Sequence, residues 1–350
     1  MRQLSWSLLL WLCACGTVAG TKPDAQAEAD ACVAETDMAF CARLGNACES
    51  RTSADNCGMQ RTVDCGTCAG AMGCVVGTCK MPVCSSFTYT QAALPMFSRA
   101  GIEDSIGSAT PSGQVILYIM TPDDAVCQSF ELVVADETAP GSGTYTQRNV
   151  TADFNAKGLY TGQNGHTITA DGLTIITNST DRKRWVSTKR SAINMTDFGA
   201  PSTADFDAIN GQIATNAGTF SAPVISADGL QFIYLIGNVD TATNGIYSSV
   251  RASTTVPFPA GTKMPPPVQD YPFASGMSSD RLALFLFDNY SGRVLTRKST
   301  SLPFTNRNAP APPPQLAGWQ HTPLADCSKV LAMTSPGGCQ NEDVILLTRQ

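Results

Sequence analysis

A five-fold internal repeat is the feature that most constrains how this chain folds. A turn containing Asp or Ser, often followed by Gly, precedes a short apolar strand five times. The copies begin at residues 111, 170, 227, 279 and 325, so the spacing falls from 59 to 46 residues. A period of this length, built from short strands, is typical of propeller blades. The repeat therefore predicts a mostly β protein.

A second signal repeats in step with the first. After each turn and strand comes another strand that ends in basic residues, and in three copies a Phe follows it. These are residues 185–190 with Phe198, residues 246–251 with Phe258 and residues 294–298 with Phe304. The fifth copy ends with residues 344–349 and lacks an outer strand, which residues 86–92 are expected to supply. Such closure protects sheet edges, so residues 85–350 are predicted to form a five-bladed propeller. The alternative is six blades, with a degenerate one in residues 140–165.

These repeats resemble the TolB-type, WD-repeat-like propellers of bacterial envelopes. The turns that contain Asp171 and Asp228 carry the resemblance, with weaker matches at Asp280 and Asp326. The resemblance implies the propeller fold and says little about activity. An Asp before Gly accepts local backbone hydrogen bonds and tolerates tight turns. The four Asp residues are therefore predicted to be structural turn residues, not metal ligands.

Ahead of the repeats lies a segment dense in cysteine. Of the 14 cysteines in the chain, eight fall within residues 32–79: Cys32, Cys41, Cys48, Cys57, Cys65, Cys68, Cys74 and Cys79. A domain of about fifty residues buries too little apolar surface to fold unaided. Disulfides of about 2–4 kcal/mol each supply the missing stability. Residues 32–84 are therefore predicted to form a small disulfide-rich module with a helix over residues 35–44, and the spacing leaves the pairing open.

Zinc is the competing interpretation of this module, because Cys65 and Cys68 have the C-x-x-C spacing of zinc knuckles. The module contains no His, and its spacings do not repeat as C-x-x-C pairs. Disulfides are therefore favoured, and no metal is expected. The segment also resembles a Cys-rich module common at the N-termini of exported proteins of gliding, predatory bacteria. That resemblance implies a surface module without known catalysis.

The N-terminus indicates export. An apolar run over residues 4–12 follows Met1 and Arg2 and is too short to span a bilayer, as in a signal peptide. Residues 12–16 then resemble a lipobox, which implies that Cys15 receives lipid and that the chain is cut before it. We therefore expect a signal peptide over residues 1–14 and a lipidated tether over residues 15–31. The alternative is an ordinary signal cut near residues 19–20.

The expected location is the cell envelope, where the acylated N-terminus would anchor the protein in the outer membrane. Gly16 follows the lipid-acceptor position, where Asp would favour retention in the inner membrane. With Cys13 removed and Cys15 acylated, twelve cysteines are left for disulfides. Cys327 and Cys339 flank a hairpin turn and are expected to pair, and Cys84 is then expected to pair with Cys127.

Composition narrows the function classes. The net charge of −6 provides no basic footprint for nucleic acid. Only two histidines occur, His166 and His321, and no motif joins either to catalytic partners. Both are expected in loops or on the surface. The sequence therefore predicts no cofactor and no catalytic residues.

A non-enzymatic binding or scaffold role, for a protein or glycan ligand at the propeller face, is the prediction that follows. The alternative is a five-bladed-propeller glycoside hydrolase acting on polysaccharide, which needs convergent carboxylates. Glutamates are scarce in the repeat region: Glu103, Glu131, Glu137 and Glu342. Of these, Glu131 lies in a predicted strand from which it could face the channel.

Overall fold

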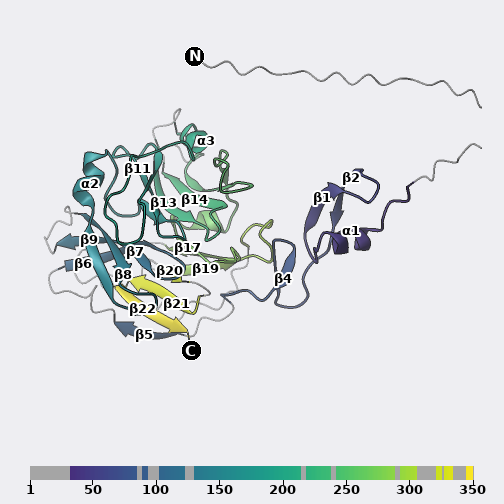
Figure 1. Cartoon of the computed structure of the whole chain (residues 1–350), viewed down its shortest axis with the longest axis horizontal. Coiled ribbons are helices and arrows are strands. Elements are labelled where there is room, and N and C mark those ends of the chain that lie inside the picture. The colour runs from purple at the N-terminus through teal and green to yellow at the C-terminus, as the bar shows by residue number, and fades with distance from the viewer. Residues whose placement is uncertain are drawn as a thin grey trace, which may run out of the picture.

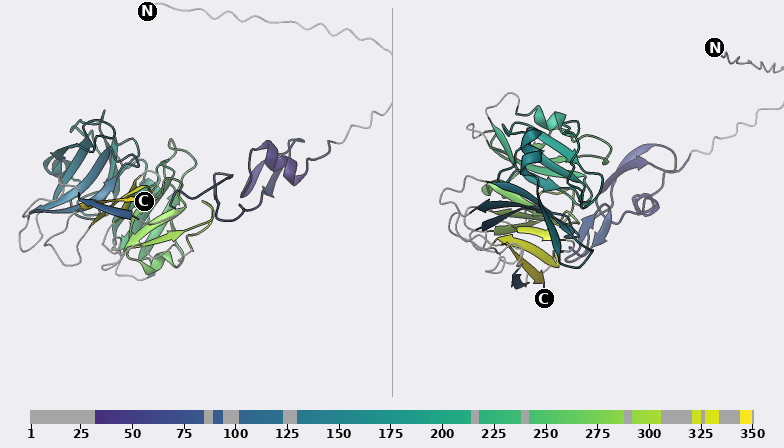
Figure 2. Two further views of the ribbon diagram at one scale, coloured as in Figure 1. Left: turned by 90° about the horizontal axis from the view of Figure 1, so that it is seen from below. Right: turned by 60° about the vertical axis from the view of Figure 1, so that its left-hand side comes forward.

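The computed structural model describes residues 32–84, 89–93, 102–122, 130–213, 218–237, 242–287, 292–305, 321–324, 327–333 and 344–349. Figures 1 and 2 show a small N-terminal module projecting from the side of a ring of sheets. Among these residues no helix has the length and apolar character needed to cross a membrane.

Five antiparallel sheets make up the ring, and each is one blade. Blade 1 is β6(Ile102–Ala109), β7(Val115–Pro122), β8(Glu131–Glu137) and β9(Tyr145–Asn149), and blade 2 is β10(His166–Ile168), β11(Thr174–Asn178) and β12(Trp185–Lys189). Blade 3 is β13(Thr219–Ile225), β14(Gln231–Gly237), β15(Gly245–Val250) and β16(Thr262–Lys263). Blade 4 is β17(Phe273–Met277), β18(Ala283–Phe287) and β19(Gly292–Thr296). Blade 5 is β20(His321–Leu324), β21(Lys329–Met333), β22(Val344–Arg349) and β5(Tyr89–Ala93).

The ring closes as the repeats predict. The innermost strands contact one another in the order β6, β10, β13, β17, β20 and back to β6. The outer strand of blade 5 comes from the other end of the repeat region, because β5 pairs with β22 and places Gln91 opposite Leu347. Residues 140–165 hold β9 and the helix α2(Thr151–Ala156), not a sixth sheet. The five-bladed propeller is thus confirmed.

The repeated Asp turns join the first and second strands of the blades. In blade 3 the hydroxyl of Ser226 donates to Asp228 Oδ1 at 2.6 Å, and the amide of Leu230 donates to the same oxygen at 3.1 Å. Asp171 and Asp280 accept equivalent pairs of hydrogen bonds. The carboxylates therefore serve the turns. Asp326 lies outside the described residues. We call the end of the ring where these turns lie the turn end, and the other end, where the inner strands begin, the entry end.

The basic residue after the third strand explains the second repeat. The Nε groups of Arg190, Arg251 and Arg297 donate to carbonyl oxygens of the turns, those of Gly172, Gly229 and Arg281, at 2.8–3.0 Å. Each guanidinium also lies over the Phe that follows it, with distances to the ring centroids of 5.6, 4.2 and 4.3 Å. The Asp turn, the Arg and the Phe therefore recur together because they form one contact.

Apolar clusters between neighbouring blades hold the ring together. Between blades 1 and 2, Leu117 and Ile119 pack with Ile168 and Ile175. Between blades 2 and 3, the fully buried Trp185 contacts Phe220, Phe232 and Tyr234. Each fully buried apolar side chain of this size contributes about 1.5–3 kcal/mol, so burial between sheets dominates the stability of the propeller. Short helices α3(Asp207–Asn210) and η1(Val268–Asp270) lie in the blade connections.

The module contains the predicted helix. It comprises α1(Asp37–Arg43), β1(Ser50–Ala54), β2(Gln60–Asp64), β3(Gly73–Val75) and β4(Thr78–Lys80). Helix α1 begins where the hydroxyl of Thr36 accepts the amide of Ala39 at 3.2 Å, and it ends before Gly45, whose φ is +68°. This start and this end are the ones that the sequence indicates.

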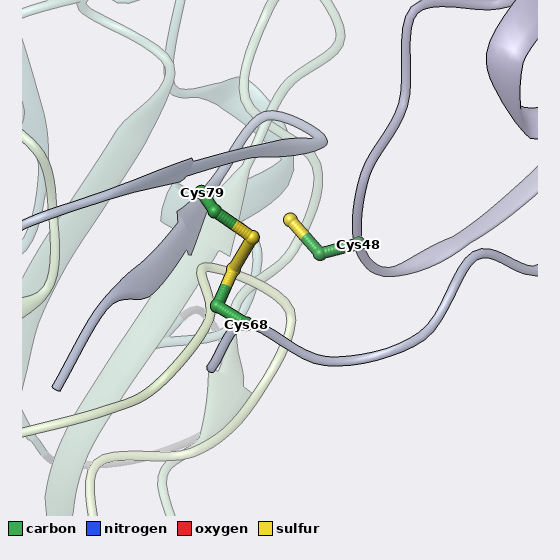
Figure 3. A group of neighbouring side chains, drawn as sticks. All are labelled: Cys48, Cys68 and Cys79. Atoms are coloured by element: carbon green, nitrogen blue, oxygen red, sulfur yellow. A yellow bond between two sulfur atoms is a disulfide. The ribbon is translucent and has the colours of Figure 1, made fainter. Parts of the chain in front are cut away.

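Four disulfides lie within the module. They are Cys32–Cys57, Cys41–Cys65, Cys48–Cys74 and Cys68–Cys79. Figure 3 shows the sulfur of Cys48 beside the Cys68–Cys79 bond, and the sulfurs of these three residues lie within 4.8 Å of one another. Since Cys65 and Cys68 are both oxidised, neither offers a thiolate to zinc.

The pairing predicted for Cys84 and Cys327 is wrong. These two residues form a disulfide with each other, so Cys84 does not pair with Cys127, and Cys327 does not pair with Cys339. The reason is ring closure. Since β5 must reach β22, the chain leaving the module passes the turn before β21, where Cys327 lies. Cys127 and Cys339 are outside the described residues.

The module contacts the turn end at blades 4 and 5. The amide of Cys74 donates to the carbonyl of Lys298 at 2.7 Å, and the amide of Val83 donates to Asp280 Oδ2 at 2.9 Å. Arg349 in turn donates to the carbonyl of Val83 at 2.9 Å. The loop that holds Glu49 also reaches blade 4, where the hydroxyl of Ser299 donates to the Glu49 carboxylate. The module is thus fastened to the ring by hydrogen bonds as well as by one disulfide.

Candidate functional site

The channel on the ring axis is narrow at the turn end. A cavity of about 30 Å³ lies there, lined by residues of all five inner strands. Its polar lining consists of hydroxyls: Ser108, Thr167, Ser226, Ser275, Ser279 and Thr322. A space of this size holds a water or two. No residue lining this cavity is a carboxylate, so this end of the channel provides no acid–base pair.

Two carboxylates share one face of blade 1 at the entry end. Asp104 lies opposite Met120 across β6 and β7, and Met120 lies opposite Glu131 across β7 and β8. Directly opposed residues of antiparallel strands project from the same face of a sheet. Asp104 and Glu131 therefore stand in one row with Met120 between them. With strands about 4.8 Å apart, their Cα atoms are separated by about 10 Å.

The environments of the two carboxylates differ. Asp104 is fully buried, whereas Glu131 is only partly buried. The row lies on the face that packs toward blade 5, because Met120 contacts the apolar cluster between blades 5 and 1. Glu131 is on the third strand from the axis, so the expectation that it faces the channel is wrong. A strand assignment alone does not say which strand of a blade is innermost.

This separation has a chemical meaning. Glycosidases that invert the anomeric centre hold their two carboxyl groups about 6.5–9.5 Å apart, and retaining enzymes hold them about 5–5.5 Å apart. In this chain the Cα atoms of Asp104 and Glu131 are about 10 Å apart, and Met120 projects from the same face between them. The row therefore brings two carboxyl groups onto one face of blade 1, which is the type and number of groups that glycoside hydrolysis uses.

The other glutamates of the repeat region do not join this pair. Glu137, at the turn end of β8, accepts hydrogen bonds from the amides of Gly141 and Gly143 at 2.9 and 2.8 Å and so orders a loop. The side chain of Glu103 and all of Glu342 lie outside the described structure. Glu137 is thus a structural residue.

Both histidines are buried on inner strands, so the expectation of loop or surface positions is wrong. His166 begins β10, and its Nε2 lies 2.7 Å from the carbonyl oxygen of Tyr160. His321 begins β20, and its Nε2 has no hydrogen-bond partner among the described residues. Burial lowers the pKa of each imidazole to about 4, which makes both neutral at pH 7. Neutral imidazoles fit this apolar setting because charging them there costs desolvation.

A second hollow lies at the turn end between blades 3 and 4. Its volume is about 600 Å³, within the range of ligand sites. Gln231, Lys263 and Arg297 line it together with several hydroxyl-bearing residues. The basic residue that ends each third strand is visible in the sequence, but the groove is not, because it depends on how two blades meet.

Comparison with known proteins gives only remote likenesses. No protein-family model matches the chain, and no curated protein matches it. The chain is similar in structure to the α-L-arabinofuranosidase PaAbf62A from Podospora anserina at 9% identity and a TM-score of 0.45, over 76% of this chain and 97% of that one. It is similar to a glycosyl hydrolase from Bacteroides ovatus at 11% identity and a TM-score of 0.38, over 71% and 84%. It is also similar to regucalcin, a calcium-binding protein from Agrobacterium tumefaciens, at 10% identity and a TM-score of 0.40, over 75% and 94%.

These matches correct one prediction. The expectation of no enzymatic activity is contradicted, because several of the matched propellers are glycoside hydrolases. Identities of 9–13% carry no information on a substrate, so an activity has to be argued from the residues of this chain. The chain itself is a mostly β protein in which a disulfide-rich module precedes a five-bladed propeller.

Proposed function

We propose that the propeller is a glycoside hydrolase that cleaves a polysaccharide. The observation that supports this proposal is the row formed by Asp104 and Glu131 at the entry end of blade 1. The two carboxyl groups differ in environment, with Asp104 buried and Glu131 partly exposed, and such a difference separates an acid from a base. Binding of a glycan, one of the two ligand classes expected from the sequence for a non-enzymatic role, is then the first step of the reaction.

The chemistry follows from two carboxyl groups acting on opposite faces of one sugar ring. One, as the acid, gives its proton to the glycosidic oxygen as the bond from that oxygen to the anomeric carbon breaks. The other, as the base, takes a proton from water while the water oxygen bonds to the same carbon. The product is a free sugar end of inverted configuration. After the reaction the acid has lost one proton and the base has gained one. Exchange with solvent restores both groups to their starting states.

Polysaccharide hydrolysis by the purified protein, measured as release of reducing ends from a panel of neutral and acidic glycans, tests the proposal. Asp104→Asn and Glu131→Gln are each expected to lower the rate by about 10²–10⁴-fold, the contribution typical of one acid or base. Glu137→Gln, on the turn end of the same strand, keeps an acceptor for the loop amides and is expected to stay active. Absence of turnover on the whole panel, with intact fold by circular dichroism, would refute the proposal.

We also propose that the chain works at the cell envelope as a lipoprotein anchored through Cys15. The apolar run over residues 4–12 and the lipobox support this, although Cys15 lies outside the described residues. The four disulfides of the module agree with an oxidising compartment. Two or three acyl chains give a stable anchor, since each buried CH₂ contributes about 0.8 kcal/mol, and the partner is then a lipid bilayer.

Cell fractionation and intact mass of a Cys15→Ala variant test the anchor. The variant is expected to leave the membrane fraction and to lose the mass of the acyl chains. Unchanged membrane association would contradict the lipoprotein proposal. It would leave the hydrolase proposal, which rests on blade 1, to be judged by its own experiment.

A further inference from the structure

Three arginines occupy the same place in three blades, but their neighbours differ. Arg190 is fully buried, and its Nη2 and Nη1 lie 2.6 and 2.8 Å from the two oxygens of Asp136 on blade 1. Arg251 lies 3.9 Å from Asp205. Arg297 contacts no carboxylate within salt-bridge distance among the described residues. Its Nη2 donates instead to the neutral Gln231 Oε1 at 2.9 Å, across the boundary with blade 3.

The guanidinium of Arg297 is held by several contacts, but these engage only some of its N–H groups. Its Nε donates to the carbonyl of Arg281 at 2.8 Å, its Nη1 to that of Leu302 at 3.3 Å, and its Cζ lies 4.3 Å from the ring centroid of Phe304. A guanidinium has five N–H groups. Three are engaged here, so one on each Nη has no acceptor among the described residues. The residue is 8% exposed.

This cation keeps its charge despite burial. Desolvation is the main cause that lowers the pKa of Arg297 to about 10, which leaves it protonated at pH 7. The acidic groups that act on it, Glu49 and Asp280, raise the pKa but form no salt bridge with it. A buried charge without a counter-charge is costly. A ligand that brings a negative charge therefore gains more here than at Arg190, where Asp136 already provides one.

The groove beside Arg297 has the form of a ligand site. Its charged lining residues, Arg297 and Lys263, are both cationic, and it holds about 600 Å³. Ser248, Ser249, Thr262 and Ser301 add hydroxyls to the lining, while Met264 and Leu302 add apolar surface. Hydroxyl donors and acceptors match the hydroxyls of a sugar, and the two cations match an acid group on it.

We infer that this groove binds the carboxylates of an acidic polysaccharide, with one uronate on the free N–H groups of Arg297 and a neighbouring one near Lys263. The site lies at the turn end, so it is separate from the Asp104–Glu131 row at the entry end. It deepens the proposed function by naming the substrate class, but its geometry does not depend on hydrolysis.

Binding of sodium polygalacturonate to the purified protein, followed by calorimetry in physiological salt, tests the inference. The fully methyl-esterified polymer, which lacks the charge, is expected to bind at least about tenfold more weakly, because a charge-assisted pair is lost. Gln231→Glu places a carboxylate against Arg297 and is expected to weaken binding of the acidic polymer by a similar factor without lowering Tm. Lys263→Ala, at a partly exposed residue, is expected to weaken it several-fold.

Gln60→Glu, on an exposed position of the module, makes the same charge change away from the groove and is expected to bind as the wild type does. Equal affinity of the Gln231→Glu variant, or of the neutral polymer, would overturn the inference. Binding of inorganic phosphate or of anionic lipid vesicles without binding of polygalacturonate would also overturn it. The Asp104→Asn, Glu131→Gln double variant is expected to bind polygalacturonate normally, so loss of hydrolysis and loss of this site are distinguishable.

Discussion

The module and the propeller are stabilised by different means. The module holds four disulfides and an apolar cluster of only Phe40, Cys41 and Val63, with Leu44 and Cys65 packed against it. The propeller buries large apolar clusters between all its blades and shares with the module a single disulfide, Cys84–Cys327. A short segment has too much surface for its volume, so covalent bonds replace the core. Reducing conditions are therefore expected to act mainly on the module, and mildly acidic pH mainly on the propeller.

The largest expected effect is that of a reducing agent on the module. Its four disulfides contribute about 2–4 kcal/mol each, on the order of 10 kcal/mol together, which exceeds what its small core supplies. Dithiothreitol is therefore expected to unfold residues 32–80, while the ring, which loses Cys84–Cys327 but keeps its apolar clusters, is weakened and stays folded. Hydrogen exchange with mass spectrometry measures both regions at once. Loss of protection in β11 and β14 at the same reductant concentration would contradict the comparison.

Removal of the disulfide that joins the module to the propeller is expected to have the next largest effect. Cys84 and Cys327 are separated by 243 residues, for which the chain-entropy relation gives about 5 kcal/mol. Replacing both by Ser is expected to destabilise the propeller by up to this amount, as measured by urea denaturation followed through Trp185 fluorescence. Replacing Cys68 and Cys79 instead, with a separation of 11 residues, should leave the Trp185 transition unmoved. An equal shift of the urea midpoint in the two double variants would show that the Cys84–Cys327 disulfide does not stabilise the propeller.

A charge change tests the propeller alone. Asp136→Asn leaves Arg190 buried without a counter-charge and is expected to cost about 3–5 kcal/mol. Asp205→Asn is the matched control, because the Asp205 side chain is about half exposed and its partner Arg251 is 3.9 Å away, so a loss below about 1 kcal/mol is expected. Denaturant midpoints of the two variants measure the difference. Equal losses of stability in the two variants would show that the buried Asp136–Arg190 pair contributes no more than the more exposed Asp205–Arg251 pair.

Between pH 6.5 and 4, acid is expected to weaken the propeller more than the module, because both histidines are on inner strands. Their folded pKa values of about 4 lie below the ordinary value of 6.5, so the unfolded chain takes up protons first. Stability is complete above pH 6.5, falls between pH 6.5 and 4 by on the order of 3 kcal/mol per histidine, and falls no further from these groups below pH 4. Urea midpoints across this range, for the wild type and for His321→Asn, measure the slope. A variant with the wild-type slope would refute the assignment.

The parts of the fold that follow from local signals were predictable. The Asp turns, the strands after them and the helix start at Thr36 depend on residues adjacent in sequence. The closing strand was predictable for another reason, since the fifth copy of the repeat lacks an outer strand. The Arg and Phe that recur in step with the Asp turns were visible in the sequence too. The structure supplies the reason, since Arg297 and its counterparts each contact both a turn carbonyl and a Phe side chain.

The parts that depend on long-range register were not predictable. The Cys84–Cys327 bond requires ring closure, which brings residues from the two ends of the repeat region together. The shared row of Asp104 and Glu131 depends on the pairing of β6, β7 and β8, with a register shift between Ile106 and Ser108. The uncompensated charge of Arg297 depends on a neighbouring blade offering Gln231 where another offers Asp136. None of these has a signature in adjacent residues.

The most direct test of the central claim is the configuration of the first product. Proton NMR during hydrolysis of a susceptible polysaccharide detects the anomer before it equilibrates. The proposed roles of Asp104 and Glu131 as acid and base on either side of one sugar predict inversion, and a rate lowered by about 10²–10⁴-fold for the Glu131→Gln variant. Retention of configuration, which requires carboxyl groups about 5–5.5 Å apart, or full activity of that variant, would contradict the account.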